Sequence, residues 1–335
     1  MPKLERAPTR VMISPAVDSR RWMGFEPRDG DIIVATFPKC GTTWTQRIVD
    51  LLVHQSPDIR PVGEISPWLD STIFNPLETD LGRLAAQTHR RYVKSHAPFD
   101  ALPVWNSVKY IHVGRDGRDA RLSWQNHQAG FRPEFRQRIV ANAMAMAQAE
   151  GRAAAAPPPA PPSDPREFLL QWMDDLEAAL SGPQSSDPPF FQFEATYWKE
   201  RARSNLLLVH YDDMIENLPA EMRRISDFLE IDTPASLMPA LVDAARFAAM
   251  KTHGDELNPK LKVAFDRGAD RFINQGRSGR WREVLRSEDA ARYEAIAARS
   301  VPPALAAWLA GGRRAVGEPR EIADAAADRA IAPAA

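Results

Sequence analysis

The chain of 335 residues carries 43 basic and 44 acidic side chains, a formal net charge of −1, and is 44% hydrophobic. This length suits one large α/β domain or two ordinary ones, and the near-zero charge gives no overall attraction to nucleic acid or membranes. Cys40 is the single cysteine, which excludes an intramolecular disulfide and a cysteine-based metal cluster. No apolar run approaches the roughly 18 residues that span a bilayer, so we expect a cytoplasmic protein.

The first predicted structural unit follows a polar, Pro- and Arg-rich lead-in, residues 1–28, which is expected to be irregular. Residues 31–52 have the pattern of a strand, a tight turn and a helix, beginning with the apolar run Ile32–Ala35. In such a unit the first N–H groups of the helix attract anions, Gly41 allows close approach of the backbone, and Lys39 adds a positive charge. The turn is therefore a candidate phosphate site.

The order of residues in this turn differs from a Walker A loop, G-x-x-x-x-G-K-[ST]. Lys39 precedes Gly41 by two positions, and Thr42 and Thr43 follow. Without the lysine–hydroxyl order, the usual reason to expect a nucleotide-bound metal is missing. An ordinary strand-to-helix turn, in which Gly and Thr serve only the turn and the cap, explains the same residues.

Further along the chain, apolar strand patterns alternate with helical ones. The predicted strands are residues 92–96, 108–113 and 206–211. Helices are predicted at 80–91, from Asp119 onward, and at 168–180, 190–203, 222–229, 236–250 and 287–300. The predicted loops are 56–67, the Pro/Ala-rich surface loop 151–165 and 271–281, and the tail 313–335 is expected to be disordered. The alternation predicts an α/β fold in which a P-loop-like parallel sheet is flanked by helices on both faces of a single domain.

Four polar segments are expected to meet at one crevice: the Lys39 turn, Lys94 to His96, Arg115 to Ser123, and residues 271–281. All but the last follow predicted strands, and parallel sheets bind ligands beyond the carboxyl ends of their strands. Their lysines, arginines, hydroxyls and imidazole suit a ligand with more than one phosphate-like group and a reaction that needs a proton acceptor. Neither G-x-S-x-G nor H-E-x-x-H occurs, so serine hydrolase and zinc protease signatures are absent.

Five segments, in order between about residues 30 and 285, resemble the cytosolic or aryl type of PAPS-dependent sulfotransferase, in a bacterial-like form. PAPS is 3′-phosphoadenosine 5′-phosphosulfate. TFPKCGTTW resembles the family's 5′-phosphosulfate loop, KSHAPFDALP its K-x-H segment, and YIHVGRDGRDARLSW its 3′-phosphate motif. LVHYDDMIENLPAEMRRISDFLEI and FINQGRSGRW resemble its Y-E-D-M/L stretch and its closing R-K-G-x-x-G-x-W loop.

The resemblance implies a set of donor-binding residues. The 5′-phosphosulfate would be held by Lys39, Cys40 (through its backbone), Gly41, Thr42 and Thr43. Trp44 would stack on adenine, and Tyr211 would lie near the adenosine. The 3′-phosphate would be bound by Arg115, Ser123, Gly276 and Arg277.

The resemblance also implies how the reaction proceeds. His96 would be the general base toward a hydroxyl of a small-molecule phenol or alcohol, with Lys39 and Lys94 beside the transferring sulfuryl group. The family domain would cover residues 29–312, and no metal, nucleic acid or membrane partner is expected. The aromatic residues Trp68, Phe74, Trp124, His127 and Phe131 fit either an acceptor pocket or the core.

Departures from the family pattern keep other readings open. Asn274-Gln275 stands where the family has Arg-Lys, and the family's dimerisation signature is not recognisable, so the oligomeric state does not transfer. A kinase or NTPase is one alternative, because LLLVHYDD loosely resembles a Walker B strand ending at Asp212. The other is a nucleotide-binding protein that has lost catalysis.

Overall fold

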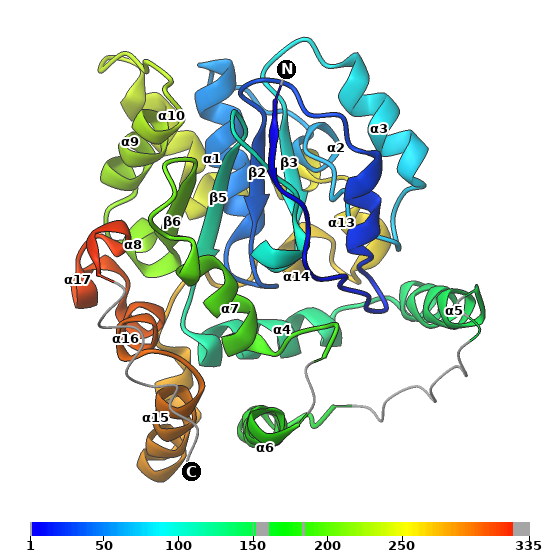
Figure 1. The fold of residues 1–335 in the computed structure, drawn as a ribbon, viewed down its shortest axis with the longest axis vertical. Coiled ribbons are helices and arrows are strands. Elements are labelled where there is room, and N and C mark those ends of the chain that lie inside the picture. Colours follow the sequence, from blue (N-terminus) through cyan, green and yellow to red (C-terminus); the bar gives the residue numbers. More distant parts are fainter. Residues whose placement is uncertain (1, 150, 152–160, 183–184, 324–335) are drawn as a thin grey trace.

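The computed structural model describes residues 2–149, 151, 161–182 and 185–323. Its centre is a four-stranded parallel sheet in the order β3-β2-β5-β6 (Figure 1). The strands are β2 (Ile32–Ala35), β3 (Tyr92–Ser95), β5 (Lys109–Gly114) and β6 (Leu206–His210). Since the strands are parallel and in register, their carboxyl ends lie at one edge, and the predicted fold class is confirmed.

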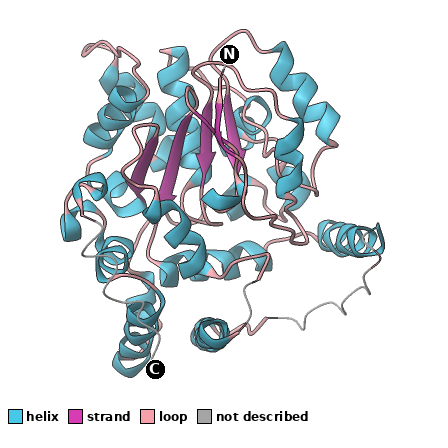
Figure 2. Cartoon of the chain, in the orientation of Figure 1, coloured by secondary structure: helices cyan, strands magenta, loops and turns pink. Residues whose placement is uncertain are grey.

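Helices cover both faces of this sheet (Figure 2). Ile32 and Val34 of β2 pack into a cluster with helices from one face, and Ile33 and Ala35 pack into the cluster on the other. The first cluster includes α1 (Thr42–His54), α9 (Leu218–Phe228) and α10 (Met238–Ala245). The second includes α6 (Pro165–Ser181), α7 (Phe190–Lys199), α15 (Ser287–Ser300) and α16 (Pro303–Gly311). Burial on both faces explains why these strands are continuous apolar runs.

A third, smaller cluster lies apart from the sheet and includes Phe135, Leu261 and Phe265. It joins α5 (Pro133–Ala149), α13 (Leu261–Ala264) and α14 (Ala269–Phe272), and α14 also contacts α4 (Gly117–Ala129).

The remaining elements are short. They are β1 (Leu4–Arg6), η1 (Ser19–Gly24), α2 (Val62–Ile65), α3 (Leu77–Ala86), η2 (Phe99–Ala101), β4 (Val104–Trp105), α8 (Tyr211–Glu216), α11 (Phe247–Thr252), α12 (Gly254–Leu257), η3 (Arg280–Glu283), α17 (Arg313–Val316) and η4 (Pro319–Glu321). Within the described ranges, none of the helices combines the length and apolar character that crossing a bilayer requires.

The structure corrects two expectations about the ends of the chain. The lead-in is not wholly irregular, because β1 pairs with β4 and Trp22 of η1 is buried in the core. The disorder predicted after Arg313 does not hold for residues 313–323, where Arg313 pairs with Glu221 and Glu318 pairs with Arg224, each at 2.7 Å. Residues 324–335 and 152–160 of the predicted loop lie outside the described residues.

Two helical predictions also differ from the structure. The single helix expected over 236–250 is divided between α10 and α11, because Arg246 adopts an extended conformation with ψ of 151°. Helix α5 was not predicted at all. Its sequence is rich in alanine and methionine, and only Phe135 and Ala147 are buried, so no apolar stripe marks it.

Candidate active site

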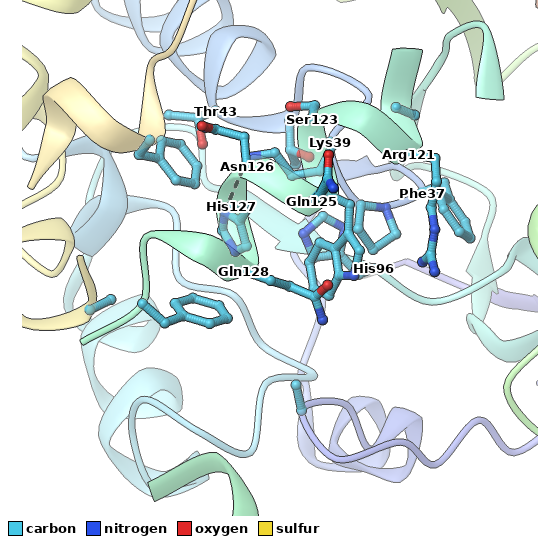
Figure 3. A pocket seen from close by; sticks show the side chains of 18 of the residues that line it. Phe37, Lys39, Thr43, His96, Arg121, Ser123, Gln125, Asn126, His127 and Gln128 are labelled. Atoms are coloured by element: carbon cyan, nitrogen blue, oxygen red, sulfur yellow. Dashed lines mark hydrogen bonds between the residues drawn. The ribbon is translucent and has the colours of Figure 1, made fainter. Parts of the chain in front are cut away.

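The carboxyl ends of the four strands open into one cavity of about 1760 Å³. Strand β2 leads into the turn with Lys39, β3 into His96, β5 into Arg115 and β6 into Tyr211. These segments are far apart in sequence but adjacent in the sheet, as the parallel topology requires. Lys39, His96 and Ser123 lie around the same space (Figure 3).

Nearly all of the predicted site residues line this cavity. They are Lys39, Gly41, Thr42, Thr43, Trp44, Lys94, His96, Arg115, Ser123, Tyr211, Gly276 and Arg277. Cys40 is the exception: its side chain is buried with Sγ 4.0 Å from the Pro38 carbonyl, and burial raises the pKa of its thiol. The structure brings these residues together, while their individual roles stay predictions.

The turn between β2 and α1 has the geometry of an anion site. Gly41 has φ of 99°, and a Cβ there would lie 2.9 Å from the Tyr211 ring, so the position suits glycine in conformation and in space. The hydroxyls of Thr36 and Thr42 are 2.6 Å apart. The first bond of the helix runs from Thr45 N to Gly41 O at 3.0 Å, which leaves the preceding amides of the helix without helical acceptors.

Lys39 directs its ammonium toward aromatic residues of the cavity. Nζ lies 3.2 Å from Nδ1 of His127 on α4 (Figure 3) and 4.2 Å from the centroid of the Phe272 ring. Burial, helped by the charges of Lys94 and Arg115, lowers the pKa of Lys39 to about 7. Burial also lowers the pKa of His127 well below its ordinary value. His127 is therefore neutral, and its Nδ1 accepts a hydrogen bond from the ammonium.

His96 is held as a neutral base. Its Nδ1 lies 2.8 Å from the Thr36 carbonyl oxygen, and because a carbonyl only accepts, Nδ1 carries the proton. Nε2 then has a free lone pair, and it makes no hydrogen bond with any described residue. Burial, and next the charge of Lys94, lower the pKa of His96 well below its ordinary value. The Asp70 carboxylate accepts the backbone N–H of His96 at 3.3 Å, which fixes this position.

Lys94 lies on the aromatic wall beside His96. Its Nζ is 4.6 Å from the centroid of the Trp68 ring, and that ring is 4.8 Å from the imidazole of His96. Burial lowers the pKa of Lys94 to about 8; the Asp70 charge raises it and the Lys260 charge lowers it further.

Arg115 is clamped between two loops. Its Nη1 donates to the Lys39 carbonyl at 3.0 Å, its Nη2 donates to the Arg277 carbonyl at 3.2 Å, and the guanidinium lies 4.0 Å from the Tyr211 ring centroid. Its Nε is buried and lacks a partner among the described residues. Nearby, Trp44 meets the Tyr211 ring edge-on at 5.5 Å. The clamp holds a positive charge against an aromatic pair.

The loop before η3 is anchored by two aspartates. Asp119 of α4 accepts hydrogen bonds from the N–H groups of Gly279 at 2.6 Å and Trp281 at 3.3 Å. Asp212 of α8 accepts a hydrogen bond from the hydroxyl of Ser278.

The side chain of Arg277, in the same loop, pairs with a carboxylate. Its guanidinium donates to Glu283 at 2.6 Å, so the side chain is engaged outside the predicted phosphate contact.

Sequence reasoning missed the carboxylates that hold the site, Asp70 and Asp119, and the ring of Phe272 beside Lys39. Asp212 was noted only as the end of a strand that loosely resembles Walker B. Asp119 and Asp212 do lie beside predicted site residues in the chain, but no local pattern tells which distant N–H groups they accept. Within the described residues, no group of three or more His, Cys, Asp or Glu could hold a metal ion.

The aromatic residues that fitted either a pocket or the core all line the cavity: Trp68, Phe74, Trp124, His127 and Phe131. The His127 ring stacks on Trp124 at 5.1 Å and meets Phe265 edge-on at 4.8 Å. One part of the cavity thus presents helix amides and Arg115, and another presents mainly aromatic rings.

Comparison with known sequences agrees with this geometry. Residues 29–304 match the family model described as the sulfotransferase domain. A glycolipid sulfotransferase of Mycobacterium tuberculosis is 34% identical over 313 residues, which cover 89% of this chain and 93% of that protein. Sulfotransferase 1 family member D1 of Mus musculus is 26% identical across 81% of this chain and 82% of that protein.

Solved structures share the fold at lower identity. A retinol dehydratase in complex with androsterone and the inactive cofactor PAP has a TM-score of 0.60 and 21% identity, with 84% of each chain covered. Mouse sulfotransferase SULT7A1 complexed with PAP has a TM-score of 0.56 and 17% identity, with 85% of this chain and 89% of that chain covered. The domain match and the relatives exclude the kinase alternative. The chain belongs to the sulfotransferase family and is an enzyme of sulfuryl transfer.

Proposed function

We propose that this enzyme moves the sulfuryl group of PAPS to a hydroxyl of a small-molecule acceptor, with His96 as the general base. The observation that carries the proposal is the hydrogen bonding of the His96 imidazole. Its Nδ1–H donates to the Thr36 carbonyl, so Nε2 is the nitrogen that can accept a proton. His96 lines the same cavity as Lys39 and Lys94.

The residues present fit PAPS as donor. The partnerless buried Nε of Arg115 and the free amides at the start of α1 are unmet hydrogen-bond donors, which suits phosphate and sulfate oxygens. Lys39, Gly41, Thr42 and Thr43 would hold the phosphosulfate, with Cys40 contributing only backbone. Trp44, Arg115, Ser123, Tyr211, Gly276 and Arg277 would hold the nucleotide and its 3′-phosphate. Bound there, PAPS supplies an activated sulfuryl group.

The chemistry then follows from charge and geometry. The acceptor oxygen would form a bond to sulfur on the side opposite the bridging oxygen, and the bond between sulfur and that bridging oxygen would break. Nε2 of His96 would take the proton of the acceptor hydroxyl. Lys39 and the amides of α1 stabilise the negative charge that grows on the leaving oxygen. Lys94 stabilises the sulfuryl oxygens. A base in this position contributes roughly 10²–10⁴-fold to the rate.

The acceptor is a hydroxyl on a largely apolar body. Trp68, Phe74 and Phe131 line the space beside His96, and such a wall binds apolar surface. Relatives named for glycolipid acceptors and a neighbour solved with androsterone support an amphipathic alcohol or phenol.

The variant His96→Asn tests the base. Its amide N–H can still donate to the Thr36 carbonyl, yet it offers no basic nitrogen. We expect turnover to fall about 10²-fold or more, while calorimetric affinity for 3′-phosphoadenosine 5′-phosphate (PAP) stays within about threefold. His253→Asn is the matched control, because His253 is exposed and pairs only with Glu256 among the described residues.

The donor is tested by the same calorimetry in EDTA and in Mg²⁺, with ATP for comparison. We expect PAP to bind tightly, with the same affinity in EDTA and in Mg²⁺, and with a higher affinity than ATP. Preference for Mg·ATP would refute the donor, and unchanged turnover in His96→Asn would refute the base. PAP binding without transfer to any hydroxyl acceptor would refute the proposed acceptor class and leave the donor in place.

A further inference from the structure

The walls of the cavity carry far more positive than negative charge. The basic residues that line it are Lys39, Lys94, Arg115, Arg121, Arg136, Lys260, Arg271, Arg277 and Arg280, and the acidic ones are Asp175 and Asp187. PAPS brings roughly four negative charges, up to two on its 3′-phosphate and two on its phosphosulfate. The donor therefore leaves part of this positive charge unmatched.

Lys260 is one of the cavity's cations that the proposed donor site does not use. It immediately precedes α13, on the aromatic wall rather than beside the turn with Lys39. Its Nζ lies 5.5 Å from the centroid of the Phe74 ring, and Phe74 lies 6.0 Å from Trp68. Trp68 in turn contacts His96. Lys260 thus stands two rings away from the base, along the surface that an acceptor would cover.

The ammonium of Lys260 contacts the Phe74 ring but has no hydrogen bond or ion pair with any described residue. Asp80 and Glu64 act on it only at longer range, and Asp80 is already engaged by the amide of Asn75 at 2.6 Å. Burial is the main cause that lowers the pKa of Lys260. A half-buried cation without a counter-ion, facing a cavity, is energetically unfavourable until an anion arrives.

We propose that the acceptor carries an anionic group, a carboxylate, sulfate or phosphate, that pairs with Lys260 while its hydroxyl lies at His96. Lys260 is then a specificity-determining residue, and the substrate class narrows to anionic amphiphiles with a free hydroxyl. This inference rests on the proposed function, because it takes the end of the cavity at His96 to be the acceptor site.

The test is calorimetric titration of PAP-saturated enzyme with ω-phenylalkanoic acids of increasing length and with their methyl esters. PAP occupies the phosphate-binding groups, so an added carboxylate must find its partner elsewhere. We expect the acid of optimal length to bind about tenfold more tightly than its ester. Lys260→Met, which keeps the length and apolar stem, should abolish this preference. Lys262→Met is the matched control, because Lys262 is exposed, does not line the cavity and pairs with Asp255.

Two results would overturn the inference: esters that bind as tightly as acids at every length, or a preference for acids that survives Lys260→Met. Lys260→Glu adds an independent arm, since it should reverse the preference toward phenylalkylamines. If the proposed donor site is wrong, the calorimetric titration with PAP described above will show no binding, which is a separate result. Acid binding at the vacant phosphate groups would be recognised by its loss once PAP is added.

Discussion

At the residue scale, Lys39 shows how the protein positions a buried positive charge where an anion can bind. Its ammonium is buried, lies near two other cations, and is stabilised by the lone pair of His127 and the face of Phe272. These contacts offset only part of the cost of burial, so the pKa of Lys39 lies at about 7. An anion bound at the turn would supply the missing counter-charge.

The first residue-scale prediction concerns proton uptake on PAP binding at pH 8. Lys39, with a pKa of about 7, is mostly neutral at that pH, and nearby phosphate charge raises its pKa, so binding should take up a proton. Calorimetry in two buffers of different ionisation enthalpy measures the uptake. PAP itself is fully deprotonated at pH 8 and contributes nothing.

Substitution identifies the group that takes up the proton. Lys39→Met should reduce the uptake, leaving only a contribution from Lys94, whose pKa is about 8. Lys262→Met, an exposed lysine away from the cavity, should leave it unchanged. Uptake that is identical in Lys39→Met and the parent enzyme would exclude Lys39 as the phosphate-facing cation.

At the scale of elements, the loop of residues 274–281 belongs to the proposed donor site. It has few apolar side chains, and its position depends on Asp119 of α4 and Asp212 of α8. Because the Arg277 carbonyl accepts from Arg115, the loop also completes the clamp on that guanidinium. These hydrogen bonds, together with the buried ring of Trp281, let a loop of this composition take one conformation.

Asp119→Ala tests the anchor. It leaves the N–H groups of Gly279 and Trp281 without their acceptor, so PAP affinity should fall about tenfold as the loop loosens. Asp119→Asn removes the same charge but keeps one acceptor oxygen, and should lose less. Calorimetry gives the affinities and thermal unfolding the stability. Equal losses for Ala and Asn would assign the effect to charge and not to the anchor.

At the scale of the whole molecule, α16 packs against strand β6 and helix α7 through Trp308. Trp308 is 1% exposed and packs beside His210 of β6 and Trp198 of α7. A Cβ on Gly114, the last residue of β5, would lie 2.3 Å from its ring. The strand that delivers Arg115 is therefore in close contact with a helix nearly 200 residues later.

Trp308→Ala should lower the free energy of unfolding by about 3–5 kcal/mol, because it removes a large buried ring and leaves a cavity under the sheet. Urea denaturation measures the change. Met23→Ala, at a side chain 78% exposed, should alter stability by no more than about 0.5 kcal/mol. A loss below about 1 kcal/mol for Trp308→Ala would show that α16 contributes little to the domain.

The sequence by itself determined what depends on neighbouring residues. The strands Ile32–Ala35 and Tyr92–Ser95, the turn with Lys39 and Gly41, and the parallel topology were predictable, because local hydrophobic runs and turn chemistry encode them. Parallel topology also foretold that His96 and Arg115 would meet the turn, since equivalent strand ends share one edge.

Only the tertiary structure decided what depends on residues distant in the chain. The pairing of β1 with β4, the anchor from Asp119 to Gly279, and the contact of Lys39 with His127 join segments about 90 to 160 residues apart. No periodicity in the sequence records such pairs. The charge balance around Lys260 is likewise a property of a cavity built from many elements, because a residue's counter-ions are defined by distance in space.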